Sequence, residues 1–527
     1  ISHTHNHNHN HNHIIDSYQN FKQTKLTQSN FTLSAVAALA TTSFAGGDSD
    51  IAAQLAAMKQ EIASLKSQLS TNTASIAKVD KLAKKATKKA NHAKMLANGD
   101  NLKFSVNFRT SIDKINYSHA GGTKSKNDGL MTNRLWLKAA YAPSENVSFR
   151  STLAYNKAYG DSANHSQING SKYADFDWVT NENALGNELK VKEAYWLYQN
   201  DTFLGNDISW TASVGRRPST GGQGINLREG EGEQSPLAHA TNVEFDGASF
   251  RFNLDKVTPL TGGWIKLCMG RGLTNATSRF QGDGADYATD EDTNLHGNVD
   301  MVGFIFVPYD DGQYSVNTQY SVAKNFIGFE MGSMTTFTQA DGTQGAQSTA
   351  AFQDVGDLKL ANVMFKANGI GEGINDFLDD TNLVASWAQS KSVSNGQMLG
   401  DPNNQTGHSE WIALNMPAGD DARFGLEWNQ GSKWWRAVTY AEDTMIGSKL
   451  AARGTAVEAY YNRNLTKALS MSLRATKITY DWTGSNGFGG VGSAPTDMST
   501  ITSANAAMYG NPVKEAKDIR LAITYSY

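Results

Sequence analysis

The feature that most constrains the fold is an alternation of apolar and polar residues that recurs from residue 102 to residue 527. The first segment alternates apolar Leu102, Phe104, Val106 and Phe108 with polar Lys103, Ser105, Asn107 and Arg109. A period of two is that of a β-strand with one apolar and one polar face. Comparable segments lie at residues 133–142, 146–156, 188–198, 207–216, 243–254, 263–270, 298–307, 313–322, 326–337, 358–366, 381–389, 408–415, 423–428, 434–441, 455–462, 467–480 and 518–527. This count predicts about 16–18 strands.

The connections between these segments fall into two length classes. Residues 142–146 form a tight turn, whereas residues 157–186 and 271–297 are long polar stretches. Short turns at one end and long loops at the other are typical of a transmembrane barrel. Hydrocarbon offers no partner for backbone N–H and C=O groups, so a membrane-spanning sheet has to close on itself.

The last segment carries the sharpest pattern of this kind. Its apolar face consists of Ile519, Leu521, Ile523, Tyr525 and Tyr527, so the chain ends on an aromatic residue. We expect this strand to close the barrel against the first strand and to carry the signal for the barrel-insertion machinery. The alternative is a soluble protein that ends in an amphipathic strand by chance.

The N-terminal region has the three parts of a secretory signal. Lys22 and Lys25 precede an apolar core at residues 31–40, and small residues follow up to Ala45. We therefore expect a signal peptide at residues 25–45. The alternating His and Asn residues before it make residues 1–24 a tag-like or upstream extension. The apolar core is too short for a membrane-spanning helix, and no other segment has the length for one.

Residues 46–99 show a heptad repeat in place of the period of two. Its expected seam positions are Ile51, Leu55, Met58, Ile62, Leu65, Leu69, Asn72, Ile76 and Val79. A strict repeat of seven predicts an α-helical coiled coil of identical chains, located in the periplasm. The lysines in its second half form either a solvated helix face or a contact with an anionic polymer of the cell wall.

Several classes of function are not supported by the sequence. The 47 Lys and Arg residues nearly balance the 51 Asp and Glu residues, so no nucleic-acid partner is indicated. Cys268 is the single cysteine and is expected to be a small strand residue, not a catalytic thiol. No catalytic motif is present, so we expect neither an enzyme nor a cofactor. Acidic residues at 283–292 and at Asp310 and Asp311 form either solvated loops or a weak calcium site.

A barrel of this size would enclose an aqueous lumen. The polar faces of two strands predict the pore-lining residues Lys103, Arg109, Lys190 and Lys192. The Gly-rich segment after residue 214 is the candidate constriction, with Arg216, Arg217, Arg228, Glu229, Glu231 and Glu233. Charged groups of both signs at a constriction would set its selectivity. The alternative is that this segment forms an exposed loop or a short periplasmic turn.

Two stretches resemble known families. Residues 458–473 resemble a hairpin of general bacterial porins, in which a tyrosine precedes a turn and an alternating strand. Residues 214–229 and 235–247 resemble a little-characterised family of outer-membrane barrel proteins with an N-terminal coiled coil. The resemblance implies an outer-membrane location in a Gram-negative cell and, by analogy with porins, a homotrimer. It implies no activity.

The sequence thus predicts an all-β transmembrane antiparallel barrel over residues 100–527, preceded by a coiled coil. The expected function is passive diffusion of small polar solutes or ions through the outer membrane. Its expected partners are outer-membrane lipid and other copies of the chain. The alternative is a structural protein with a plugged barrel, whose coiled coil tethers the outer membrane to the cell wall.

Overall fold

The computed structural model describes residues 56–57, 59–67, 102–160, 189–217, 221–274, 297–328, 334–338, 344–348, 353–371, 373–396, 398–439, 442–484 and 494–527. The chain divides into two compact units, Ile1–Gly99 and Asp100–Tyr527. Within the first unit, residues 56–57 and 59–67 are helical. Ile62 and Leu65 are exposed there, and the other predicted seam residues lie outside the described residues. The coiled coil therefore stays a prediction.

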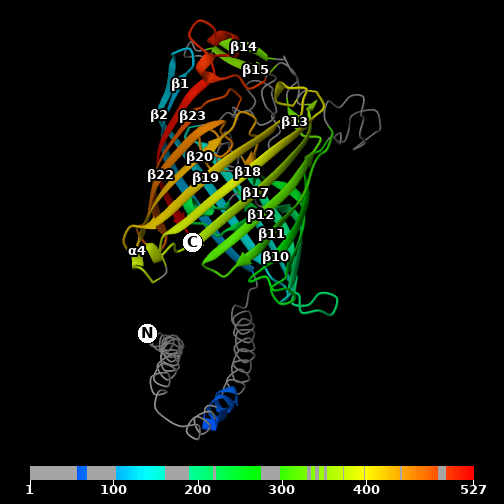
Figure 1. Ribbon diagram of the computed structural model, residues 1–527. Coiled ribbons are helices and arrows are strands. Elements are labelled where there is room, and N and C mark those ends of the chain that lie inside the picture. Colours follow the sequence, from blue (N-terminus) through cyan, green and yellow to red (C-terminus); the bar gives the residue numbers. More distant parts are fainter. Residues whose placement is uncertain are drawn as a thin grey trace, which may run out of the picture. The chain divides into compact units, whose positions relative to one another are not determined.

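The second unit is a closed barrel of 16 antiparallel strands (Figure 1). In order around the ring, the strands are β1 (Leu102–His119), β2 (Lys124–Tyr141), β3 (Val147–Ala158), β4 (Lys190–Asn200), β5 (Trp210–Arg217), β9 (Phe245–Asn253), β10 (Trp264–Leu273), β11 (Val299–Asp310), β12 (Tyr314–Lys324), β17 (Gly356–Asn368), β18 (Asn382–Ser394), β19 (Thr406–Pro417), β20 (Ala422–Gly431), β22 (Gly454–Asn464), β23 (Leu469–Tyr480) and β24 (Val513–Ser526). The predicted fold class and strand number are confirmed.

The first and last strands close the ring, as the C-terminal pattern predicts. β24 pairs with β1 in an antiparallel register that places Tyr525 opposite Phe108. Tyr527 extends the ladder, because its backbone exchanges two hydrogen bonds of 2.9 Å with Val106. Closure satisfies the backbone groups that two free edges would leave without partners.

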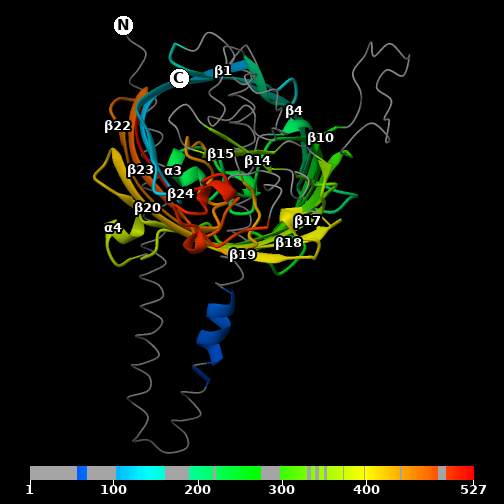
Figure 2. The same cartoon turned by 90° about the horizontal axis from the view of Figure 1, so that it is seen from above.

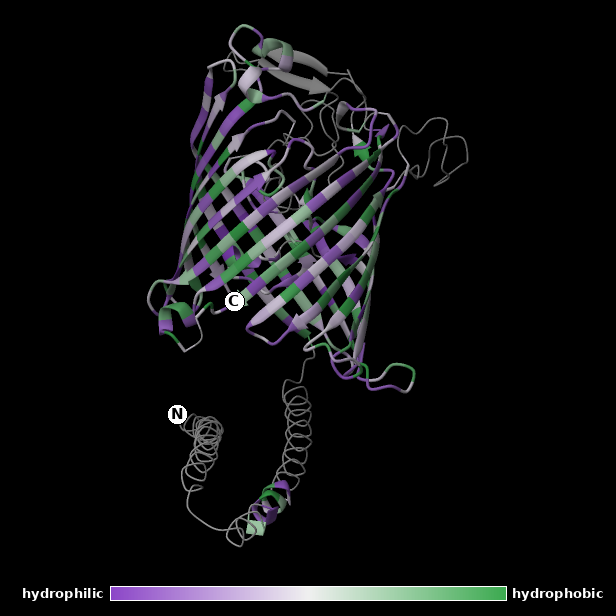
Figure 3. Ribbon diagram, viewed as in Figure 1, coloured by the Kyte–Doolittle hydropathy of each residue, from purple (hydrophilic) through white to green (hydrophobic). Residues whose placement is uncertain are grey.

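The outer face of the barrel is apolar. Ile519, Leu521, Ile523 and Tyr525 are exposed on β24, and Phe104 and Phe108 are exposed on β1. The residues between them point into the barrel, and Figure 3 shows this alternation of hydropathy along the strands. Such an outer surface suits hydrocarbon and not water. No helix among the described residues is long and apolar enough to span a membrane.

The connections differ between the two ends of the barrel. Residues 142–146, 311–313, 418–421 and 465–468 connect strands at the end that also carries α4 (Asp376–Asp379). Longer connections at the opposite end join β3 to β4, β10 to β11 and β23 to β24. The shorter elements there are β13 (Ile327–Gly328), β14 (Met334–Thr338), β15 (Gln344–Ser348), β16 (Gln353–Asp354), η3 (Met398–Gly400), η4 (Met498–Thr500) and η5 (Ala506–Tyr509). The ends are called the short-turn end and the long-loop end below.

Two predicted barrel strands are wrong. Residues 326–337 include β13 and β14, which belong to separate two-stranded sheets in the connection between β12 and β17. Residues 434–441 include β21 (Val438–Thr439), which pairs with another loop inside the barrel. The apolar residues Phe326, Ile327 and Val438 of these segments are buried inside the protein. Sequence periodicity does not distinguish such burial from a lipid-facing strand.

Candidate pore and constriction

The connection between β5 and β9 enters the barrel. Within residues 221–244 it forms β6 (Gly222–Gln223), α3 (Asn226–Glu229), β7 (Gln234–Leu237) and β8 (Thr241–Asn242). Figure 2 shows α3 inside the ring of strands. Ile225, Leu237 and Ala240 in this segment are completely buried. The segment is thus neither an exposed loop nor a short turn.

Apolar side chains attach this segment to one side of the lumen. Ile225 and Leu237 pack in a buried cluster with Met364 of β17, Val384 of β18 and Trp411 of β19. These three strands present apolar residues to the inside as well as to the outside, so this part of the lumen is filled like a protein core.

Gly224 shows how closely the segment approaches the wall. Its φ of +93° lies in the left-handed region, and a Cβ built at this position would stand 2.5 Å from Cη2 of Trp411. Only glycine meets both conditions without strain.

The connection between β20 and β22, residues 432–453, also enters the barrel. Its β21 pairs in parallel with β8, which places Val438 beside Thr241. His239 lies at this junction, and its imidazole nitrogens lie 2.9 Å from the hydroxyls of Ser386 and Ser409. Burial lowers the pKa of His239 to about 3, so the side chain is neutral at ordinary pH.

On the opposite side of the lumen, the second inward loop meets a cluster of arginines on the wall. The Asp443 carboxylate accepts hydrogen bonds from Arg109 of β1, at 2.8 Å, and from Arg520 of β24, at 2.9 Å. Arg134 of β2 lies 3.3 Å from the same carboxylate. Arg474 of β23 donates to the Asp443 carbonyl oxygen at 2.5 Å. One loop residue therefore contacts four strands of the barrel.

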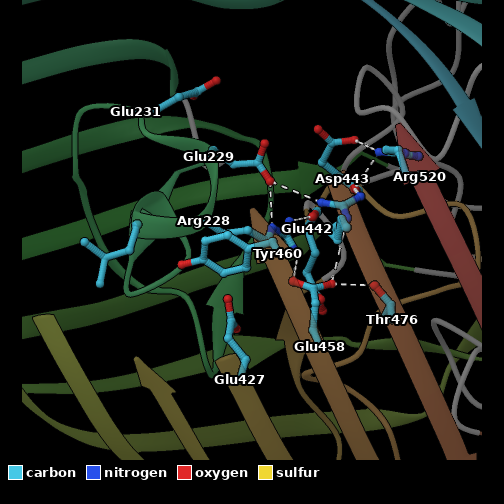
Figure 4. A network of polar contacts seen from close by, with 12 residues as sticks. Arg228, Glu229, Glu231, Glu427, Glu442, Asp443, Glu458, Tyr460, Thr476 and Arg520 are labelled. Atoms are coloured by element: carbon cyan, nitrogen blue, oxygen red, sulfur yellow. Dashed lines mark hydrogen bonds and ion pairs between the residues drawn. The ribbon is translucent and has the colours of Figure 1, made fainter. Parts of the chain in front are cut away.

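The helix α3 adds its own charges beside this cluster (Figure 4). Glu229 lies 2.7 Å from Arg228 and 3.4 Å from Arg474, and Glu231 lies 3.6 Å from Arg134. Acidic side chains on the inward loops thus face basic side chains on the wall.

A second group of ion pairs lies behind α3. The Lys449 ammonium lies 2.7 Å from both Glu427 of β20 and Glu458 of β22. Glu458 also accepts hydrogen bonds from Arg228, at 3.2 Å, and from Thr476, at 2.6 Å. These side chains are buried, and removing one partner from such a group leaves an uncompensated charge.

Two loop carboxyl groups beside the arginines differ in their titration. Burial favours a higher pKa for Asp443, but Arg109 and Arg520 outweigh it and hold this pKa well below its ordinary value. For Glu231, burial dominates over the distant Arg134 and raises the pKa. Asp443 therefore stays ionised at mildly acidic pH, whereas Glu231 takes up a proton more readily than an ordinary glutamate.

A cavity of about 750 Å³ leads from the short-turn end to this cluster. Its lining includes the turns at residues 418–421 and 465–468, together with Arg109, Arg134 and Arg520. We call this space the vestibule. It is polar and large enough to hold many water molecules.

The structure brings part of the predicted site together. Arg109, Arg228, Glu229 and Glu231 line the vestibule.

Lys192 points inward and binds Glu244 at 2.6 Å, and Arg216 binds the same carboxylate at 3.2 Å. Arg217 lies over the ring of Tyr195, at 4.1 Å. Lys103 is exposed near the short-turn end, and Lys190 lies opposite the buried Ala154. Glu233 pairs with Lys366 at 2.7 Å.

Sequence reasoning missed Arg134, Arg474, Arg520 and Asp443. The three arginines occupy polar positions in alternating strands, so the period of two could have identified them as inward-facing. Asp443 gives no comparable signal, because it follows the predicted strand at residues 434–441 and belongs to no period-two pattern.

The remaining candidate residues lie apart from the vestibule. Cys268 is a partly buried residue of β10 and forms no disulfide. Asp311 accepts backbone hydrogen bonds from Gln313 and Tyr314 and so shapes the turn between β11 and β12. The acidic residues at 283–292 lie outside the described residues. Within the part of the chain that the structure describes, no group of three or more His, Cys, Asp or Glu side chains could hold a metal ion.

A closed 16-strand barrel with loops folded into its lumen is porin-like in architecture. The chain belongs to the family described as a protein of unknown function (DUF3373), whose match covers residues 124–527. No curated protein sequence matches the chain.

Solved structures with a similar fold include an anion-selective porin from Comamonas acidovorans, with 10% identity, coverage of 81% of this chain and 99% of that chain, and a TM-score of 0.44. OprB of Pseudomonas putida has 11% identity, coverage of 83% and 96%, and a TM-score of 0.42. OmpF of Salmonella typhi, in complex with daunomycin, has 10% identity, coverage of 81% and 99%, and a TM-score of 0.41. At these values the likeness says nothing about solute or activity.

Proposed function

We propose that the protein is an outer-membrane channel for the passive diffusion of small polar solutes or ions. The vestibule is the observation that supports this proposal. It is a polar cavity with room for water, and it ends at acidic and basic side chains that face each other. The apolar outer face fits the hydrocarbon layer, and the long loops would face the outside of the cell. No enzymatic step is part of the proposal.

The selectivity of such a channel would come from side chains that line its wall. Most arginines of the cluster are paired with Asp443 or Glu229 and contribute little net charge. Lys138 differs from them, because it lies on the inward face of β2 and its side chain is exposed. We expect this lysine to attract anions into the lumen.

The test is current through a planar lipid bilayer that contains the purified full chain. We expect stepwise conductance and, in a salt gradient, a reversal potential that reports ion preference. A unit charge about 10 Å from a passing ion in water is worth about 0.4 kcal/mol, with opposite signs for an anion and a cation, so Lys138→Gln should lower the anion-to-cation permeability ratio by roughly fourfold.

Lys114→Gln is the matched control for this test. Lys114 lies on the other face of its strand, exposed and 3.8 Å from Asp128, so its loss should leave the reversal potential unchanged. An equal shift in both variants would argue that the charge effect arises at the surface and not in the lumen.

A second candidate function is a structural barrel whose lumen is closed by its own loops. The three large apolar clusters of the barrel unit, which combine inward-facing wall residues with loop residues, favour it. In that case the N-terminal coiled coil would tether the outer membrane to the cell wall. Complete absence of conductance from correctly folded protein would support the structural function and remove the channel.

The assembly and targeting of the barrel complete the proposal. The apolar face of β24, which ends in Tyr525 and Tyr527, would be recognised by the barrel-insertion machinery after export by the signal peptide. A homotrimer is the expected assembly. Mass measurement in detergent tests it, because the coiled coil by itself is compatible with two, three or four chains.

A further inference from the structure

A second cavity lies in the lumen, away from the vestibule. It has a volume of about 120 Å³ and lies between the wall formed by β9 to β12 and the inward segment at residues 234–245. Two hydrogen bonds join these sides, from Lys266 to Ser235, at 2.9 Å, and from the Leu237 backbone to Gln319, at 2.9 Å. We call this space the lateral cavity.

Two cations line the lateral cavity, and no acidic side chain does. Lys266 donates a hydrogen bond to the neutral hydroxyl of Ser235, and Arg217 stacks on a tyrosine ring. Among the described residues neither cation takes part in an ion pair, and Nη1 of Arg217 is buried without a hydrogen-bond partner. Partly buried cations without an ion-pair partner are unfavourable, so an anion in this cavity would stabilise them.

Hydroxyl groups give a second and independent indication of a ligand. Thr241 and Ser321 line the cavity, are 9% and 5% exposed, and each has a buried hydroxyl oxygen without a hydrogen-bond partner. Buried polar atoms are nearly always paired in folded proteins. An oxygen-bearing ligand would supply the missing partners from inside the cavity.

Most of the remaining lining surface is apolar and indicates the other part of the ligand. Pro236, Val243, Met301 and Ile305 offer no charge and no hydrogen-bond donor side chain. An engineered cavity of about 150 Å³ holds a molecule of benzene size, so this space admits a ligand of about four to six heavy atoms. We propose that the lateral cavity binds a small aliphatic carboxylate, with its carboxylate at Arg217 and Lys266. This goes beyond passive diffusion, because binding does not require the lumen to conduct.

Cys268 makes the proposal testable in the unmodified protein, because the single cysteine of the chain lines this cavity. Iodoacetate is itself a small carboxylate, and its thiolate reaction forms a carboxymethyl thioether and releases iodide. Iodoacetamide is its neutral counterpart. We expect the iodoacetate-to-iodoacetamide rate ratio to be at least about tenfold higher in the folded than in the unfolded chain, because buried cations concentrate anions.

Protection by unreactive ligands identifies the preferred chemistry. Butanoate should slow the labelling of Cys268 in a saturable way, and butylammonium should not. Equal rate ratios in folded and unfolded protein, together with no protection, would overturn the proposal. Protection by inorganic phosphate but not by butanoate would overturn the assignment to an aliphatic carboxylate.

Equilibrium binding gives a readout that does not depend on the thiol. Calorimetry of the full chain in detergent should show that Lys266→Met weakens butanoate binding by about tenfold or more, since a charge-assisted hydrogen bond is lost. Lys266→Arg should retain most of the affinity, and Lys114→Met, on the outer face of β1, should retain all of it. No heat of binding in the wild-type chain would contradict the proposal, whatever the bilayer recordings show about conduction.

Discussion

The inward loops are held to the two sides of the lumen by different kinds of contact. On the side of β17, β18 and β19, inward residues such as Met364, Val384 and Trp411 are apolar and pack on the inward segment. On the side of β1, β2, β23 and β24, inward arginines hold the second inward loop through Asp443. Apolar packing excludes water from the first side, whereas the charged side adjoins the vestibule.

This difference indicates how the lumen of a wide barrel is narrowed. A barrel of 16 strands encloses more space than its own side chains fill. Apolar contacts can hold a loop to one side without any group that titrates. Ion pairs at the opposite side complete the constriction while leaving polar groups for hydrated solutes. The contrast predicts that substitutions on the two sides have different consequences.

The largest effect is expected on the charged side, for Asp443→Asn. The residue has a φ of +58°, which asparagine adopts as readily as aspartate, so the loop backbone should keep its shape. Loss of the carboxylate charge leaves buried arginines uncompensated. We expect the free energy of unfolding in lipid vesicles to fall by about 3–5 kcal/mol, and the anion preference of the channel to rise.

Asp128→Asn is the control for that measurement. Asp128 forms exposed pairs with Lys114 and Lys126 near the barrel rim, so its loss should leave the unfolding free energy and the selectivity unchanged. If Asp443→Asn behaved in the same way, the arginines would not depend on Asp443 for compensation, and the constriction would be held by other contacts.

The barrel could be predicted from the sequence because lipid imposes a simple rule on each strand. Residues such as Ile519 and Leu521 have to face outward, and a period of two follows directly. The pairing of β24 with β1 follows from closure. The two predicted strands that are not part of the barrel show the limit of this rule. A segment such as Val438–Thr439 is buried because it pairs with another loop and not because it faces lipid.

The site was less accessible to sequence reasoning. Arg228, Glu229 and Glu231 could be identified because a Gly-rich segment that mixes both charge signs is unusual at a strand end. Their partners come from distant parts of the chain, as the contact between Arg109 and Asp443 shows. Such pairings depend on the closure of the barrel and on how far each loop extends into the lumen. Neither can be read from a single sequence.

A smaller effect is expected on the apolar side, for Gly224→Ala. The added Cβ would meet the Trp411 ring at 2.5 Å, in a backbone conformation that disfavours side chains. Gly230→Ala separates the effect of the Trp411 contact from the effect of the backbone conformation. Gly230 also has a positive φ, but no atom lies near the added Cβ. We expect Gly224→Ala to lower the unfolding free energy by about 1–3 kcal/mol more than Gly230→Ala does. Equal losses would show that the segment is not tightly packed against the wall.

The smallest effect concerns pH on the charged side. Burial raises the pKa of Glu231, whereas Arg109 and Arg520 keep the pKa of Asp443 low despite its burial. As pH falls from neutral, Glu231 should therefore take up a proton while Asp443 stays ionised, and the vestibule gains positive charge. The loss of one negative charge about 10 Å from a passing ion is worth about 0.4 kcal/mol, with opposite signs for an anion and a cation, or roughly a fourfold rise in the anion-to-cation permeability ratio.

Glu231→Gln isolates this contribution. At neutral pH the variant should already have the higher anion preference that the wild type approaches as pH falls, and its own reversal potential should change less over the same pH range. Arg134 loses its partner at 3.6 Å in the variant and becomes more available to anions. If the wild type and Glu231→Gln showed the same pH dependence, the titrating group would lie elsewhere in the lumen, and Glu231 would not face the path of the ions.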